Sequence, residues 1–120
     1  MTGLPVLLFM TAAAALGAYL LLLWFRMVRK PVLIGFHVLF GFAAAESLAG
    51  FLRLSGLDEA DSARRLAIVA GGFLAAAIAS GFSAPLFGKT YRRVANSLLA
   101  AHVFSGLAGL LIVAAFVSRL

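Results

Sequence analysis

The sequence predicts an all-α membrane protein in which one integral domain, residues 1–120, forms an up-down-up-down bundle of four transmembrane helices. Of its 120 residues, 64% are hydrophobic and 12% are charged, whereas a soluble domain has about 45–50% apolar and about 25% charged residues. Four stretches contain neither Lys nor Arg: 4–25, 31–52, 66–87 and 94–117. Because about 20 helical residues cross a hydrocarbon core of about 30 Å, each stretch is long enough to span the membrane once.

The first two stretches predict a helical hairpin. Residues 4–25 carry no charged side chain, and 31–52 begin at Pro31. Proline is tolerated there because the N–H that it lacks has no partner in the first turn of a helix. The short loop 26–30 makes the two helices antiparallel neighbours.

The last two stretches predict a second hairpin, joined by loop 88–93. Helices in lipid approach one another closely where their side chains are small. We therefore expect a packing face on 66–87 where small residues recur at every fourth position, at Ala67, Gly71, Ala75, Ala79 and Ser83. When residue 37 is aligned with residue 102, the local patterns of 31–52 and 94–117 match, which suggests a tandem pair of hairpins. The stretches 4–25 and 66–87 show little similarity at the same offset.

The distribution of cations predicts the orientation. Loops 26–30 and 88–93 each carry three Lys or Arg residues, whereas the opposite face has four in all, at Arg53, Arg64, Arg65 and Arg119. Cytoplasmic loops are enriched in Lys and Arg, so we expect both loops in the cytoplasm and both termini outside, in a bacterial inner membrane. The expected partner is then the lipid bilayer. Nucleic acid is not expected, because the cations behind the net charge of +6 are scattered over short loops.

The two histidines are the most informative residues. His37 and His102 follow the starts of 31–52 and 94–117 at similar distances, and both helices enter from the same side. At about 1.5 Å per residue, both imidazoles are expected roughly 10 Å inside the basic face, on helices that are diagonal in the bundle. Such a pair can ligate a haem iron from both sides. The alternative is that each imidazole only hydrogen-bonds a neighbouring carbonyl.

The residues around the histidines fit a haem pocket. A glycine stands four residues after each histidine, at Gly41 and Gly106, and would leave clearance for the edge of a macrocycle. Bulky apolar side chains are expected to shape and dry the pocket, at Leu33, Phe36, Phe40, Leu98, Leu99 and Phe104. Haem propionates are anionic and favour cations or tyrosine at the interface. The candidates are Tyr91, Arg92, Arg93, Arg26, Arg29, Lys30 and Lys89, although orientation alone also explains these charges.

The pattern His-x-x-x-Gly on two helices that run in the same direction resembles the membrane b-type cytochromes, broadly the cytochrome b561-like four-helix group. The resemblance covers 31–52 and 94–117 only. It implies a haem b ligated by His37 and His102 and an electron-transfer activity. Many members of that group hold two haems with four histidines, whereas two histidines here imply one haem. That haem, near the cytoplasmic side, would exchange electrons with a quinone or quinol, a small oxidant or a redox partner protein.

Glu46 is the only acid inside a predicted span. It is turned about 180° from His37 around the helix axis, so the two cannot share a metal. A structural pair with Arg53 is one reading of Glu46. A second is a proton-coupled transporter that uses this carboxylate. A third function class is a small accessory subunit that packs, as a homo- or hetero-oligomer, in a larger membrane complex. No arrangement for hydrolytic or group-transfer chemistry is present in the sequence.

Overall fold

The computed structural model describes residues 2–88 and 90–120, and within them the chain forms four helices and no strand. The helices are α1 (Leu4–Phe25), α2 (Pro31–Leu54), α3 (Ser62–Phe87) and α4 (Arg92–Val117). Each is long and apolar enough to cross a membrane. The molecule is 47 Å long, slightly more than the thickness of a bilayer with its headgroups, which is about 40–45 Å. The predicted all-α, membrane-spanning fold is confirmed.

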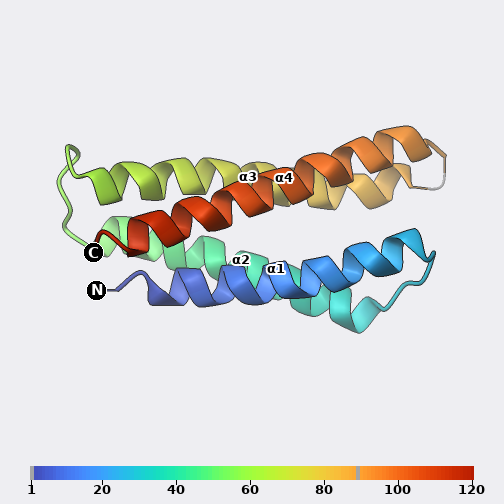
Figure 1. Cartoon of the computed structure of the whole chain (residues 1–120), viewed down its shortest axis with the longest axis horizontal. Helices are drawn as coiled ribbons and strands as arrows, with labels where there is room; N and C mark the ends of the chain where they lie inside the picture. The colour runs from blue at the N-terminus through green and yellow to red at the C-terminus, as the bar shows by residue number, and fades with distance from the viewer. Residues whose placement is uncertain (1, 89) are drawn as a thin grey trace.

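The helices alternate in direction and pack as two hairpins, α1 with α2 and α3 with α4 (Figure 1). Fewer contacts, between α1 and α4 and between α2 and α3, hold the hairpins together. Helices α2 and α4 are therefore diagonal to one another. Each hairpin is therefore packed more closely within itself than against the other hairpin.

Three helices extend beyond the apolar stretches that predicted them. Helix α2 continues to Leu54, α3 begins at Ser62, and α4 begins at Arg92. Arginines at the membrane surface continue a helix because their long side chains reach water while the backbone stays helical. Helix α3 starts where the carboxylate of Asp61 accepts a hydrogen bond of 2.8 Å from the backbone N–H of Ala63, as N-cap residues do. Pro31 begins α2, as predicted.

The packing face of α3 differs from the one that the sequence predicted. Ala75 and Ala79 are exposed, and the face that packs in the bundle instead comprises Ala63, Ala67, Ala70, Leu74, Ala77 and Ala84. Residues at every fourth position turn by about 40° per step around a helix. Such a stripe therefore moves away from a neighbouring straight helix after a few steps. Alternating steps of three and four residues keep the buried side chains facing a neighbouring helix.

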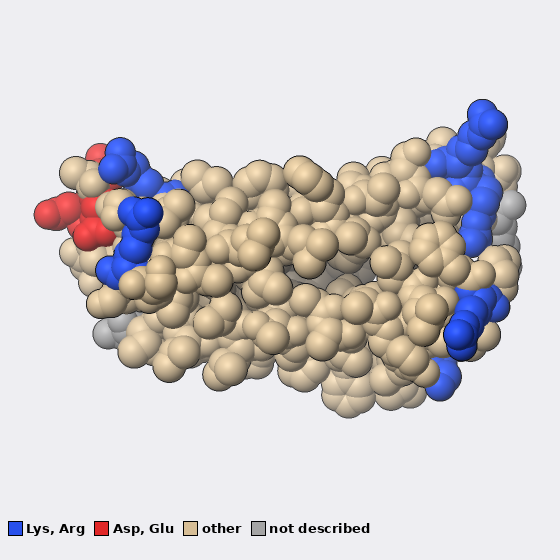
Figure 2. Space-filling view, viewed as in Figure 1, with Lys and Arg blue, Asp and Glu red and all other residues tan. Residues whose placement is uncertain are grey.

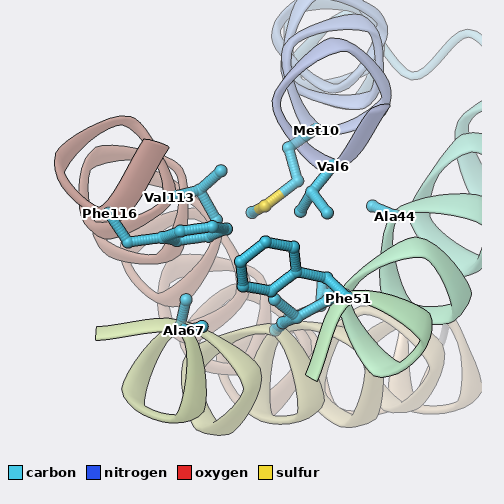
Figure 3. Close-up of a cluster of buried hydrophobic side chains, with 10 residues drawn as sticks. Val6, Met10, Ala44, Phe51, Ala67, Val113 and Phe116 are labelled. Carbon is cyan, nitrogen blue, oxygen red and sulfur yellow. The ribbon is translucent and has the colours of Figure 1, made fainter. Parts of the chain in front are cut away.

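The hydrophobic core lies toward the end that carries both termini. All four helices contribute side chains, and the rings of Phe51 and Phe116 lie 5.2 Å apart at its centre (Figure 3). Figure 2 shows Lys and Arg at both ends of the molecule and acids only at the end with the termini, so the opposite end, called the basic end here, shows cations without acids. The face between the two ends shows no charged side chain in this view, as expected of a surface in contact with lipid acyl chains.

Candidate functional site

The two histidines meet between the hairpins. His37 of α2 and His102 of α4 have ring centroids 5.7 Å apart, with an angle of 79° between the ring planes. Both residues are partly buried. The structure thus brings the two predicted ligands together at one depth, on the diagonal pair of helices.

Each imidazole is fixed by a carbonyl of its own hairpin. The Nδ1 atom of His37 donates to the carbonyl oxygen of Ala13 at 2.8 Å, and Nδ1 of His102 donates to that of Ala77 at 2.6 Å. A carbonyl only accepts, so Nδ1 carries the proton and a neutral ring presents the lone pair of Nε2. Among the described residues neither Nε2 has a hydrogen-bond partner. Each ring is therefore held in a defined orientation within its own hairpin.

In each hairpin, one glycine of the first helix makes room for the ring: Gly17 of α1 and Gly81 of α3. A Cβ atom at Gly17 would lie 3.0 Å from Cε1 of His37, and one at Gly81 would lie 2.6 Å from Nδ1 of His102. Sequence reasoning missed both positions. A signal was present, because Ala13 and Gly17 have the same spacing as Ala77 and Gly81. Ala13 and Gly17 precede Ala77 and Gly81 by one residue less than His37 precedes His102. An alignment of the hairpins on the histidines therefore did not place these residues opposite one another.

The glycines that the sequence predicted have a different environment. Gly41 and Gly106 are partly buried, and a Cβ at either would meet nothing within 4 Å. Space therefore remains beside the helices one turn from each histidine. These two glycines are not required by the histidine pair itself, in contrast to Gly17 and Gly81.

The aromatic residues divide between the inside and the outside. Phe40 is partly buried, with its ring 6.2 Å from that of Phe9 of α1. The expectation that Phe36 and Phe104 shape the pocket is not met, because they are 48% and 70% exposed. Both point to the outer surface because each lies on the side of its helix away from the bundle. The other expected lining residues are partly buried: Leu33, Leu98 and Leu99.

The predicted interface cations are not gathered at the histidines. The guanidinium of Arg92 lies over the ring of Trp24, 4.5 Å from its centroid. Tyr91 packs on Phe87 with ring centroids 6.4 Å apart, and Arg93 is exposed. Exposed positions are also found for Arg26, Arg29 and Lys30. Lys89 lies outside the described residues.

Glu46 takes no part in this site. Its side chain is exposed on α2, and Arg53 is exposed as well. In the described part of the chain, no three His, Cys, Asp or Glu side chains come close enough together to hold a metal ion. The two imidazoles are therefore the ring side chains that this arrangement brings together between the hairpins.

A shallow apolar groove lies on the outer side of α3 and α4. It has a volume of about 420 Å³ and is lined by Val69, Gly72, Phe73, Ala76, Phe104 and Ser105. The hydroxyls of Ser80 and Ser83 bond to carbonyls of their own helix at 2.7 Å. Among the described residues the hydroxyl of Ser105 has no such bond, so it is available to a molecule in the groove.

Comparisons with known proteins add no relative: no family model, no curated protein and no solved structure matches the chain.

Proposed function

We propose that the protein is a membrane haem b protein that transfers electrons through one haem, ligated by His37 and His102. The observation that carries the proposal is the pair of imidazoles, 5.7 Å apart and each oriented by a carbonyl. With metal–nitrogen bonds of about 2.0 Å, two axial imidazoles have ring centroids about 6 Å apart. The observed separation agrees with that requirement.

The surrounding residues support such a ligand set. The carbonyls of Ala13 and Ala77 accept from Nδ1 of each ring, which fixes the ring orientation and makes Nε2 a better donor to a metal. Nothing lies within 4 Å of a Cβ built at Gly41 or Gly106, so neither position would obstruct the edge of a macrocycle. When bound, a haem b supplies reversible one-electron chemistry between ferric and ferrous iron.

The proposed partners follow from where the histidines lie. The imidazoles are nearer the basic end, which the positive-inside rule assigns to the cytoplasm of a bacterial cell with both termini outside. The groove on the outer side of α3 and α4 favours a lipid-soluble quinone, because it is apolar, opens to lipid and offers the Ser105 hydroxyl to a carbonyl oxygen. Oxidation of a quinol, or reaction with a small oxidant, would then be the activity of this membrane cytochrome. A redox partner protein at the basic end is the other proposed route for electrons.

The test is the absorption spectrum of the purified protein, expressed with haem supply and recorded oxidised and then dithionite-reduced. We expect a Soret band with sharp reduced bands of a six-coordinate haem, and its loss or broadening in His37→Ala and in His102→Ala. Glu46→Gln is the control, because this exposed residue is remote from the ring pair. A colourless wild-type protein would overturn the proposal. Proton-coupled transport that depends on Glu46 would favour the transporter instead. Tolerance of all three changes would favour the accessory subunit.

A further inference from the structure

The separation of the two imidazoles is a property of the contacts between hairpins. His37 is oriented by a carbonyl of α1 and His102 by one of α3, so each ring is tied to its own hairpin. Nothing within either hairpin determines how far apart the two rings lie. Contacts between the hairpins must do so.

At the end with the termini, the core provides such contacts. The rings of Phe51 and Phe116 join α2 to α4, and closer to the histidines Phe42 of α2 lies 5.9 Å from Phe82 of α3. The Phe51–Phe116 contact lies on the side of the histidine pair toward the termini. The Phe42–Phe82 contact lies between α2 and α3. The flank between α1 and α4 at the basic end needs a contact of its own.

Four residues supply that contact and are called the Trp24 cluster here: Trp24, Met27, Arg92 and Asn96. The indole Nε1 of Trp24 donates to Oδ1 of Asn96 at 3.1 Å, and the guanidinium of Arg92 lies 4.5 Å from the ring centroid. Nη2 of Arg92 also reaches the sulfur of Met27 at 3.4 Å. The cluster thus joins the end of α1 to the start of α4 through a hydrogen bond and a cation–π contact.

The backbone of Met27 is a second, independent sign that this contact matters. Met27 has a φ of 57°, and it is the only non-glycine residue with a positive φ in the described chain. The backbone N–H of Val28 bonds to the carbonyl of Leu23, as in a helix end where glycine is the usual residue. A methionine is less suited to this left-handed conformation than glycine. Its side chain, which glycine lacks, is what reaches Arg92.

We propose that the Trp24 cluster sets the separation of the two hairpins at the basic end and thereby the distance between the imidazoles of His37 and His102. Trp24, Arg92 and Asn96 are then positioning residues that do not touch the ligand. The spectroscopic part of this inference rests on the proposed haem function, whereas the spacing itself is a property of the haem-free protein. Because metal–ligand distances tolerate only about 0.2 Å of change, a modest increase in hairpin separation would release one ligand.

The first experiment measures spacing without haem. The chain has no cysteine, so cysteines introduced at the exposed positions Val32 of α2 and Leu86 of α3 accept one spin label on each hairpin. We expect Trp24→Leu to lengthen and broaden the distribution of label distances relative to the parent. Phe25→Leu is the matched control, because Phe25 is the adjacent aromatic residue and is exposed.

The second experiment uses the haem-loaded protein. A reduced haem with both axial positions filled does not bind carbon monoxide, so the parent and Phe25→Leu should give no carbon monoxide difference spectrum. Trp24→Leu should give one, and Trp24→Phe, which keeps a ring beneath Arg92 but loses the N–H donor, should give a smaller one. If Trp24→Leu does not fold, Asn96→Leu and Arg92→Gln each remove one contact and are read in the same way.

The outcomes separate the two proposals. A parent that binds no haem contradicts the haem function, while the label distances still test the cluster. Label distributions that are the same for Trp24→Leu and Phe25→Leu overturn the positioning role even if the parent binds haem. Unchanged distances in Asn96→Leu and Arg92→Gln would overturn it in the case where Trp24→Leu cannot be made.

Discussion

Substituting Gly81 with alanine tests the most crowded contact in the site. The added Cβ would lie 2.6 Å from Nδ1 and 2.8 Å from Cε1 of His102, whereas nonpolar contacts are comfortable at about 3.5–4.0 Å. The ring would have to move by about 0.9 Å to reach the near end of that range. That movement stretches the hydrogen bond of 2.6 Å from Nδ1 to the carbonyl of Ala77.

The expected cost follows from three contributions. Overpacking costs about 1–3 kcal/mol, and a weakened neutral hydrogen bond costs up to about 0.5–1.5 kcal/mol. Alanine recovers about 0.5–1 kcal/mol over glycine in a helix. We therefore expect Gly81→Ala to lower the free energy of unfolding by about 1–3 kcal/mol. Gly17→Ala should cost less, because its Cβ would lie 3.0 Å from His37.

The assay is unfolding by SDS in mixed micelles, carried out without haem and with matched glycine controls. Gly41→Ala and Gly106→Ala place a Cβ where nothing lies within 4 Å, so they should be neutral or more stable by up to about 1 kcal/mol. In a His102→Ala background the cost of Gly81→Ala should disappear, giving a coupling energy of about 1–3 kcal/mol. Equal stability of the Gly81 and Gly106 variants, or the same cost with and without the imidazole, would refute the geometry described for His102.

Three further predictions concern the rest of the bundle. Phe116→Ala should destabilise the protein by about 3 kcal/mol, the lower end of the range for Phe→Ala, because lipid lessens the transfer contribution while the cavity remains. The same SDS titration measures this cost, and a cost below that of Phe104→Ala at an exposed position would contradict the packing. Asp61→Ala should cost about 0.5–2 kcal/mol by removing the cap of α3, and Asp61→Asn should retain most of the stability. Glu46→Gln should leave haem content and the reduced spectrum unchanged, since the side chain is exposed away from the rings; a changed spectrum would place Glu46 in the site.

The duplicated pattern of the hairpins gives the site its near symmetry. Ala13, Gly17 and His37 in one hairpin correspond to Ala77, Gly81 and His102 in the other. Each hairpin thus presents one imidazole that is backed by a carbonyl of its first helix. This near symmetry fits the proposed haem, which has two equivalent faces.

The sequence by itself determined the four membrane helices, their order and the shared depth of His37 and His102. These properties are local, since hydropathy, loop length and the rise per residue follow from the chain alone. Short loops were also enough to place α2 and α4 on a diagonal. The identification of the two histidines as the central feature of the interior therefore needed no coordinates.

Only the tertiary structure decided how each helix is rotated about its own axis. In lipid-embedded helices apolar and small residues occur on every face, so composition does not reveal which face packs. The exposure of Ala75 and Ala79 could therefore not be predicted from their spacing. The contact of Arg92 with the ring of Trp24 likewise depends on how α1 and α4 are rotated. The carbonyls of Ala13 and Ala77 could be identified as partners only from the packing of the two helices in each hairpin. Every residue has a backbone carbonyl, so the sequence does not indicate which one accepts a hydrogen bond from a histidine.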